Sequence, residues 1–305
     1  MTASASASSV GILNASDPNN AFNDWNIVHV PYCTGDLHVG NTVLDAYEIG
    51  VEALFGRPQC LGLKKKTYLN GFENTKAAFQ WAKTNYPEVE ELVIGGMSAG
   101  SLGGQLLAAY AADLWSVEAK RVKYGVLADS YVGVLPDNTP SGKVLNFYGT
   151  CDLNLNLPAS VTPKCKAETL TITEIGSAML EIIPSSSWLF INSMADDTQR
   201  LFYQLTKEGI AGFPFPNQIS PDDFFAAATK ILDTYKTLSK HISTFFVSGG
   251  QHVFLNGVTW YETVSTMGDN LGKYVANWLA NLGKDNGTTV APTVTPTVTP
   301  ARPAC

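Results

Sequence analysis

Short apolar runs alternate with longer helical patterns along most of this chain, and this alternation limits the fold more than any other feature. Runs typical of buried strands occur at residues 26–31 (NIVHVP), 91–95 (ELVIG), 122–128 (VKYGVLA), 187–192 (SWLFIN) and 244–248 (TFFVS), with a weaker run at 67–70 (TYLN). Patterns typical of helices occur at residues 74–84, 102–114, 168–182, from residue 198 onwards, 221–238 and 269–282. Strands that alternate with helices form parallel β-α-β units. The sequence therefore predicts an α/β fold, a doubly wound and mostly parallel sheet with helices on both faces.

The composition divides the chain into three parts. Hydrophobic residues make up 45% of the 305 residues, enough to build a sizeable core. The N-terminal MTASASASSV is small and polar, and from Gly287 the chain reads GTTVAPTVTPTVTPARPAC, whose repeated Thr-Val-Thr-Pro has no apolar face to bury. We therefore predict a flexible segment at residues 1–20, one folded domain at 21–285 and a disordered Thr/Pro-rich tail at 286–305.

The charge balance excludes several classes of partner. The chain has 20 Lys and Arg against 27 Asp and Glu, a net charge of −7. No basic surface is expected, so nucleic acid is not an expected partner. No apolar run reaches the roughly 18–20 residues that a membrane span requires. The N-terminal MTASASASSV has neither a cationic start nor an apolar core, so no signal peptide is expected in this sequence.

Five cysteines are present, and none forms a CxxC pair of the kind that binds zinc. Cys151 and Cys165 bracket a short loop rich in Pro and Asn, so a local disulfide between them is expected. The odd number leaves at least one thiol without a partner inside this chain.

A G-x-S-x-G motif directly follows the predicted strand at 91–95. It reads Gly96-Met97-Ser98-Ala99-Gly100, and an Ala/Leu-rich helix follows it. Glycines allow a sharp strand-to-helix turn that exposes the serine hydroxyl, and the next N–H points toward a developing oxyanion. This context favours Ser98 as a nucleophile and Ala99 as an oxyanion-hole donor over an ordinary helix N-cap serine.

A serine nucleophile needs a base, and the chain has four histidines. His29 lies inside a predicted strand, His38 lies in the loop after it, and His241 precedes a strand. His252 lies in a loop after the strand at 244–248 and after every candidate acid, which matches the order Ser, acid, His. His252 is the predicted base.

The acid that orients the base should follow a strand between Ser98 and His252. Asp129 follows the strand at 122–128, while Asp196 and Asp197 follow the strand at 187–192. Asp196 is favoured because its strand neighbours the one leading to His252. Asp129 and Asp197 remain alternatives, and a helix N-cap would also explain either Asp196 or Asp197.

The loop at residues 31–41 (PYCTGDLHVGN) is rich in polar groups and also follows a predicted strand. Tyr32, Asp36 and His38 are expected to form a substrate-side wall of the pocket. A metal site from Asp36 and His38 is disfavoured because the spacing suggests no third ligand, so neither a metal nor a cofactor is expected.

These segments together resemble the pectin acetylesterase family, which includes the Notum carboxylesterases. The resemblance runs in order over residues 21–281 and is carried by VPYCTGDLHVGN (30–41), GGMSAGSLGG (95–104), LADSYVG (127–133), ADDTQ (195–199) and SGGQHVF (248–254). It implies an α/β-hydrolase-like fold and a triad of Ser98, Asp196 and His252. The family's D-x-x-Q pattern favours Asp196 over Asp197, and its D-S segment places Asp129 beside the site.

One departure from the family pattern concerns the oxyanion hole. Family members carry a Gly-Gly-Gly or Gly-Gly-Trp turn upstream of the PYC segment, and this sequence has none. We therefore expect an N-terminally shortened form that lacks some oxyanion donors, with activity reduced accordingly. Losing one such donor costs on the order of 10²–10³ in rate in a protease.

By this resemblance the expected function is that of a serine carboxylesterase acting on acetylated polysaccharide such as pectin. The substrate-binding residues would be Tyr32, Asp36, His38 and Asp129. The family and the Thr/Pro tail predict a secreted or cell-surface protein, expected to be a monomer. Two alternatives stay open: a non-catalytic or weakly active carbohydrate-binding relative, and a lipid-type deacylase like Notum.

Overall fold

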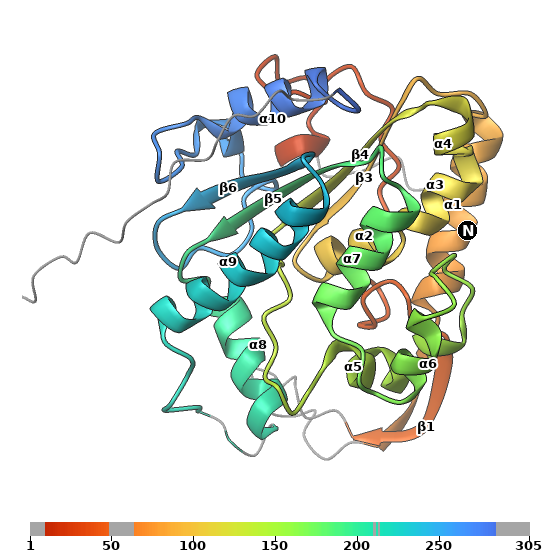
Figure 1. Ribbon diagram of the computed structural model, residues 1–305, viewed down its shortest axis with the longest axis vertical. Coiled ribbons are helices and arrows are strands. Elements are labelled where there is room, and N and C mark those ends of the chain that lie inside the picture. Colours follow the sequence, from red (N-terminus) through yellow and green to blue (C-terminus); the bar gives the residue numbers. More distant parts are fainter. Residues whose placement is uncertain (1–9, 49–63, 210–211, 213, 285–305) are drawn as a thin grey trace, which may run out of the picture.

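The computed structural model describes residues 10–48, 64–209, 212 and 214–284. Its centre is a four-stranded parallel sheet in the order β3-β4-β5-β6 (Figure 1). The strands are β3 (Glu91–Met97), β4 (Lys123–Asp129), β5 (Ser187–Ser193) and β6 (Ile242–Val247). The predicted α/β fold is confirmed, and the parallel order brings the carboxyl ends of all four strands to one edge of the sheet.

Helices cover both faces of this sheet. They are α1 (Gly71–Asn85), α2 (Ala99–Leu106), α3 (Ala108–Trp115), α4 (Val117–Lys120), α5 (Ser141–Phe147), α6 (Val161–Lys166), α7 (Ile172–Ile182), α8 (Asp197–Glu208), α9 (Pro221–Leu238) and α10 (Leu271–Ala280). Short 3₁₀ helices are η1 (Gly11–Leu13), η4 (Thr150–Asp152) and η6 (Trp260–Glu262). In Figure 1, α10 lies on one face and α2, α7 and α9 lie on the other.

The central strands are buried on both faces because their side chains alternate between two cores. In β5, Trp188 and Phe190 belong to the core beneath α2, α7 and α9, whereas Leu189 and Ile191 belong to the core beneath α10. All seven residues of β5 are buried. The apolar residues 188–191 fill both cores, and the polar residues of this strand lie at its two ends.

Side-chain caps define the starts of two helices: α9 spans the predicted residues 221–238, whereas α7 begins at Ile172, four residues after the predicted start at 168. In α9 the Ser220 hydroxyl accepts the Asp223 N–H at 3.1 Å, and Pro221 occupies the first turn. In α7, Thr171 and Glu174 form a reciprocal capping box. The single helix predicted at residues 102–114 is instead two helices, α2 and α3, with a break at Leu107.

The strand predicted at residues 26–31 is not present, so that prediction was wrong. The segment has no strand pairing, and Ile27 and Val28 are 41% and 38% exposed. A strand needs a neighbour for its backbone groups. Residues 26–30 and β3 instead line one large cavity, and among the described residues no backbone hydrogen bond joins them.

The weak strand predicted at residues 67–70 is part of β2 (Lys64–Leu69), outside the main sheet. It pairs antiparallel with β1 (Thr42–Glu48), which was not predicted. The packed region also begins before residue 21, because the Ile12 N–H donates to the Leu255 carbonyl at 2.9 Å. The predicted tail at 286–305 lies outside the described residues. Within the described part of the chain, no helix is long and apolar enough to cross a membrane.

Cys151 and Cys165 form the expected disulfide, which joins η4 to α6. Cys33 is exposed, and its thiol is free.

We expect the double variant Cys151→Ala/Cys165→Ala to lose about 3 kcal/mol of unfolding free energy, the value for closing a loop of ~15 residues. Urea unfolding of the wild type and of the double variant measures this loss of unfolding free energy. Cys33→Ser is the matched control, since its thiol is exposed and unpaired, and its midpoint should equal that of the wild type. An unchanged midpoint in the double variant would mean that the bond adds nothing to stability.

Candidate active site

Ser98 occupies a strained turn between β3 and α2. Its φ of 55° and ψ of −118° form a conformation that a non-glycine residue rarely adopts. The Ser98 N–H donates to the Asp129 carbonyl at 2.8 Å, which fixes the turn to the end of β4. Gly96 is required here, because a Cβ at that position would overlap the backbone of Gly100.

Ala99 is the first residue of α2, immediately after this turn. The first N–H groups of a helix have no acceptor within the helix, and the helix dipole places partial positive charge there. The Ala99 N–H therefore has the location expected of a donor to an oxyanion beside Ser98.

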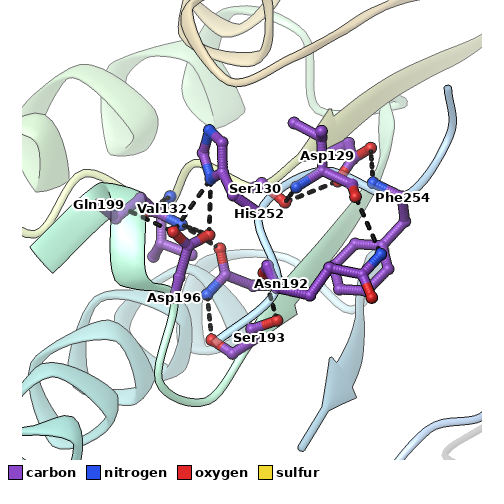
Figure 2. A network of polar contacts seen from close by, with 11 residues as sticks. Asp129, Ser130, Val132, Asn192, Ser193, Asp196, Gln199, His252 and Phe254 are labelled. Carbon is purple, nitrogen blue, oxygen red and sulfur yellow. Dashed lines mark hydrogen bonds and ion pairs between the residues drawn. The ribbon is translucent and has the colours of Figure 1, made fainter. Parts of the chain in front are cut away.

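His252 lies in the loop after β6, and its ring contacts a buried carboxylate. His252 Nδ1 lies 2.9 Å and 3.0 Å from the two carboxylate oxygens of Asp196, which follows β5 (Figure 2). The Asp196 carboxylate is fully buried, and it also accepts the backbone N–H and the side-chain amide of Gln199, each at 2.8 Å. Asp196 thus caps α8 and holds the imidazole at the same time, so the N-cap explanation and the orienting role are compatible.

The other two candidate acids lie elsewhere. The Asp197 side chain is 77% exposed and pairs with Arg200 at 3.3 Å. The Asp129 carboxylate is fully buried, and it accepts the N–H groups of Phe254 and Leu255 at 2.8 Å and 2.9 Å. Of the three, Asp196 is the one that contacts His252.

His252 Nε2 is buried and has no hydrogen-bond partner among the described residues. His252 and Ser98 line the same cavity, whose volume is 1910 Å³. The hydrogen bonds between described residues do not include one from Ser98 to His252. In unliganded enzymes such bonds are often long and tighten only with substrate. The second ring nitrogen thus makes no hydrogen bond within the described part of the chain, and the residue that carries it is part of the cavity wall.

The loop at residues 31–41 forms another wall of this cavity through Tyr32 and His38. Their rings lie 4.8 Å apart between centroids. Burial lowers the pKa of His38, and the Asp36 carboxylate opposes that shift. Leu37 and His38 both have positive φ, near 60°, which marks a backbone held in place by its surroundings.

Asp36 anchors this loop and does not line the cavity. Its carboxylate is fully buried and accepts the Gly71 N–H at 2.7 Å and the Thr34 hydroxyl at 2.6 Å. Asp129 likewise anchors a loop, the one at residues 253–255, and is absent from the cavity wall. Of the four residues predicted to bind substrate, Tyr32 and His38 are thus the ones that line the cavity.

Two further polar residues complete the surroundings of Asp196. The Gln199 amide donates to Asn192 Oδ1 at 2.6 Å, and its oxygen accepts the Val132 N–H at 3.3 Å. Gln199 was visible in the sequence only as part of the D-x-x-Q pattern. Asn192 gave no signal, because it ends an apolar strand. Across the described residues no cluster of three or more His, Cys, Asp or Glu could hold a metal ion.

No protein-family model matches the chain, and no curated protein matches it in sequence. Among solved structures, two crystal forms of the Wnt deacylase Notum from Drosophila align with 81% of it, at TM-scores of 0.48 and 0.47 and identities of 14% and 15%. The chain spans 65% and 66% of the length of those Notum chains, just under two thirds. The α/β assignment rests on the parallel sheet and its two helical layers described above, and the chain has a structural similarity to Notum at low identity.

Proposed function

We propose that this protein is a serine carboxylesterase that uses Ser98, His252 and Asp196. The observation that carries the proposal is the pairing of His252 Nδ1 with buried Asp196 while Nε2 has no partner among the described residues and the ring lines the cavity of Ser98. An imidazole held in this way has a fixed tautomer and a free basic nitrogen, which is what a weak hydroxyl nucleophile needs.

In the proposed reaction Ser98 Oγ attacks the acyl carbonyl, and its proton moves to His252 Nε2. Asp196 holds the Nδ1–H and stabilises the imidazolium. The Ala99 N–H and the start of α2 stabilise the negative charge on the carbonyl oxygen. His252 then gives its proton to the leaving alcohol. Water, activated by the same base, releases the acid from Ser98.

The substrate class we propose first is an acetylated polysaccharide such as pectin, on the strength of the sequence resemblance to pectin acetylesterases. Tyr32 and His38 would contact the sugar from the cavity wall. A disulfide is usual in proteins of oxidising compartments, so the Cys151–Cys165 bond supports a secreted or cell-surface location.

A second candidate, a deacylase for longer acyl chains, is favoured by the walls of the cavity. The volume of 1910 Å³ exceeds what an acetyl group requires, and Val134, Leu135 and Phe202 are among the apolar lining residues. A long acyl chain would bury these groups, whereas a polysaccharide would leave them in contact with water.

An ester panel distinguishes the candidates. Acetate release from acetylated pectin is expected to exceed hydrolysis of p-nitrophenyl octanoate per unit of enzyme. Faster hydrolysis of p-nitrophenyl octanoate than release of acetate from acetylated pectin would favour the long-chain deacylase. A fluorophosphonate probe on the same protein sample should label Ser98. Retention on a pectin column with neither turnover nor labelling would replace both candidates by a carbohydrate-binding protein.

A further inference from the structure

Asp129 and Ser130, at the end of β4, connect the nucleophile to the loop of the base. The Asp129 carbonyl accepts the Ser98 N–H at 2.8 Å. The Asp129 carboxylate accepts the N–H groups of Phe254 and Leu255, just after His252. Figure 2 shows the contact between Asp129 and Phe254 on the opposite side of the view from Asp196. Asp129 therefore holds the backbone of the Ser98 turn and the backbone of the His252 loop, the two segments between which the proton would move.

Ser130 extends the same connection in two directions. Its hydroxyl donates to Asp129 Oδ1 at 2.8 Å and accepts the Val253 N–H at 2.9 Å. Its own N–H donates to the carbonyl of Ile191 in β5 at 2.8 Å, close to the turn that carries Asp196. The end of β4 is thus tied to the nucleophile, to the base and to the strand of the acid.

The backbone at these joints is strained. Ser98, Ser130 and Val253 have φ values of 55°, 61° and 60°. Positive φ is uncommon for any residue with a Cβ, and for β-branched valine it is an outlier. Such conformations persist only where the surroundings hold them. The Ser130 hydroxyl bonded to the Val253 N–H is the contact that holds the residue next to His252.

We propose that Asp129 and Ser130 are positioning residues that clamp the His252 loop onto the Ser98 turn, and that the clamp is complete only while Asp129 is ionised. This deepens the proposed esterase function and rests on it for its effect on catalysis. Three donors converge on the Asp129 carboxylate: two N–H groups and one hydroxyl. A proton added to this carboxylate would remove one acceptor site from the three donors, and the Ser130 O–H that now donates to Asp129 would have to turn away.

The surroundings of Asp129 support control by pH. Burial raises its pKa to about 6, with the three hydrogen bonds and the nearby His252 opposing the shift. His252 is the titratable group that faces it. The neighbours across the sheet are Met97 of β3 and Ile191 of β5, which carry no charge. The clamp should therefore weaken as pH falls through about 6.

Ser130→Ala tests the clamp with the smallest change. We expect kcat to fall on the order of 10–100-fold with KM unchanged, by analogy with residues that orient the ligands of metal sites. Hydrogen exchange at the amides of residues 253–255 should become faster. Ser186→Ala is the matched control: Ser186 is also buried, donates to Ile183 O at 2.6 Å, and lies at the opposite end of β5. It should leave kcat and these amides unchanged.

Asp129→Asn tests the requirement for charge. The amide oxygen can still accept the two N–H groups, but nothing at that position titrates. We expect the acid side of the pH profile of kcat to involve two protonations in the wild type and one in Asp129→Asn.

The direction in which Asp129 changes the free energy of unfolding with pH follows from its raised pKa. A carboxyl with a raised folded pKa stabilises the protein at low pH and loses that contribution as pH rises. The stability of the wild type relative to Asp129→Asn should therefore decline between the unfolded value of 3.8 and about 6.

If Ser130→Ala changes neither kcat nor the amide exchange of residues 253–255, the proposal of a clamp is wrong. If the acid side of the pH profile of kcat is the same in Asp129→Asn as in the wild type, the clamp does not depend on the charge of Asp129. Fluorophosphonate labelling of wild-type Ser98 separates this result from failure of the proposed function. If Ser98 is not labelled, the esterase proposal fails. The exchange of the three amides still decides whether the clamp holds the loop.

Discussion

Replacing Ser98 with alanine is expected to lower kcat for ester hydrolysis on the order of 10⁴–10⁶-fold, because the nucleophile of the proposed triad is lost while the cavity is unchanged. The side chain occupies a turn whose backbone is fixed by the bond from its N–H to Asp129, and alanine retains that N–H. The fold should therefore persist, and circular dichroism should match that of the wild type. The measurement is initial-rate hydrolysis of p-nitrophenyl acetate, together with labelling by a fluorophosphonate.

The control for this variant is Ser101→Ala. Ser101 is a buried serine one helical turn further along α2, where its hydroxyl accepts the Gln105 amide at 3.3 Å. It should keep wild-type turnover and be labelled at Ser98. If Ser98→Ala hydrolyses acetate at the wild-type rate, the serine esterase proposal is wrong.

Asp196→Asn has the second largest expected effect, a loss of about 10⁴ in kcat, by analogy with the same change in serine proteases. An asparagine amide opposite His252 Nδ1 would favour the wrong tautomer, with the proton on Nε2, and would leave Ser98 without a base. KM should change little, because Asp196 is fully buried and absent from the cavity wall.

Asp197→Asn is the matched control, since the two carboxylates are adjacent in sequence and differ in environment. The Asp197 side chain is 77% exposed, and its pairing with Arg200 at the surface is worth little. This variant should retain wild-type kcat. Equal losses of kcat in Asp196→Asn and Asp197→Asn would argue against an orienting role for Asp196. They would indicate a general effect of charge at the start of α8.

Local signals were sufficient for most secondary structure. The strands predicted at 91–95, 122–128, 187–192 and 244–248 correspond to β3, β4, β5 and β6, with ends shifted by one or two residues, because short apolar runs are typical of a parallel sheet covered by helices. Helix α9 spans residues 221–238 as predicted, with Pro221 in its first turn. The Cys151–Cys165 disulfide was predictable from a separation of 14 residues in a loop. Each of these features depends on residues close together in the chain.

The failures concern interactions between distant segments. Residues 26–31 have the composition of a strand but no pairing partner, and an isolated apolar run gives no information about what lies beside it. Asp36 was expected in the pocket as part of a polar loop after a strand, and Asp129 through the family's D-S segment. Their carboxylates accept the N–H of Gly71 and those of Phe254 and Leu255, contacts with distant segments that the local pattern does not indicate.

The pattern of the chain was enough to specify a parallel α/β sheet and a serine held at a glycine turn, since both follow from near neighbours in sequence. The choice of Asp196 as the partner of His252 over Asp129 and Asp197 depended on contacts across 56 positions. The joining of Ser98 to the His252 loop through Asp129 depended on contacts across more than 120. Such contacts form only when the strands align, because the directions of buried carboxylates are set by the packing of the whole sheet.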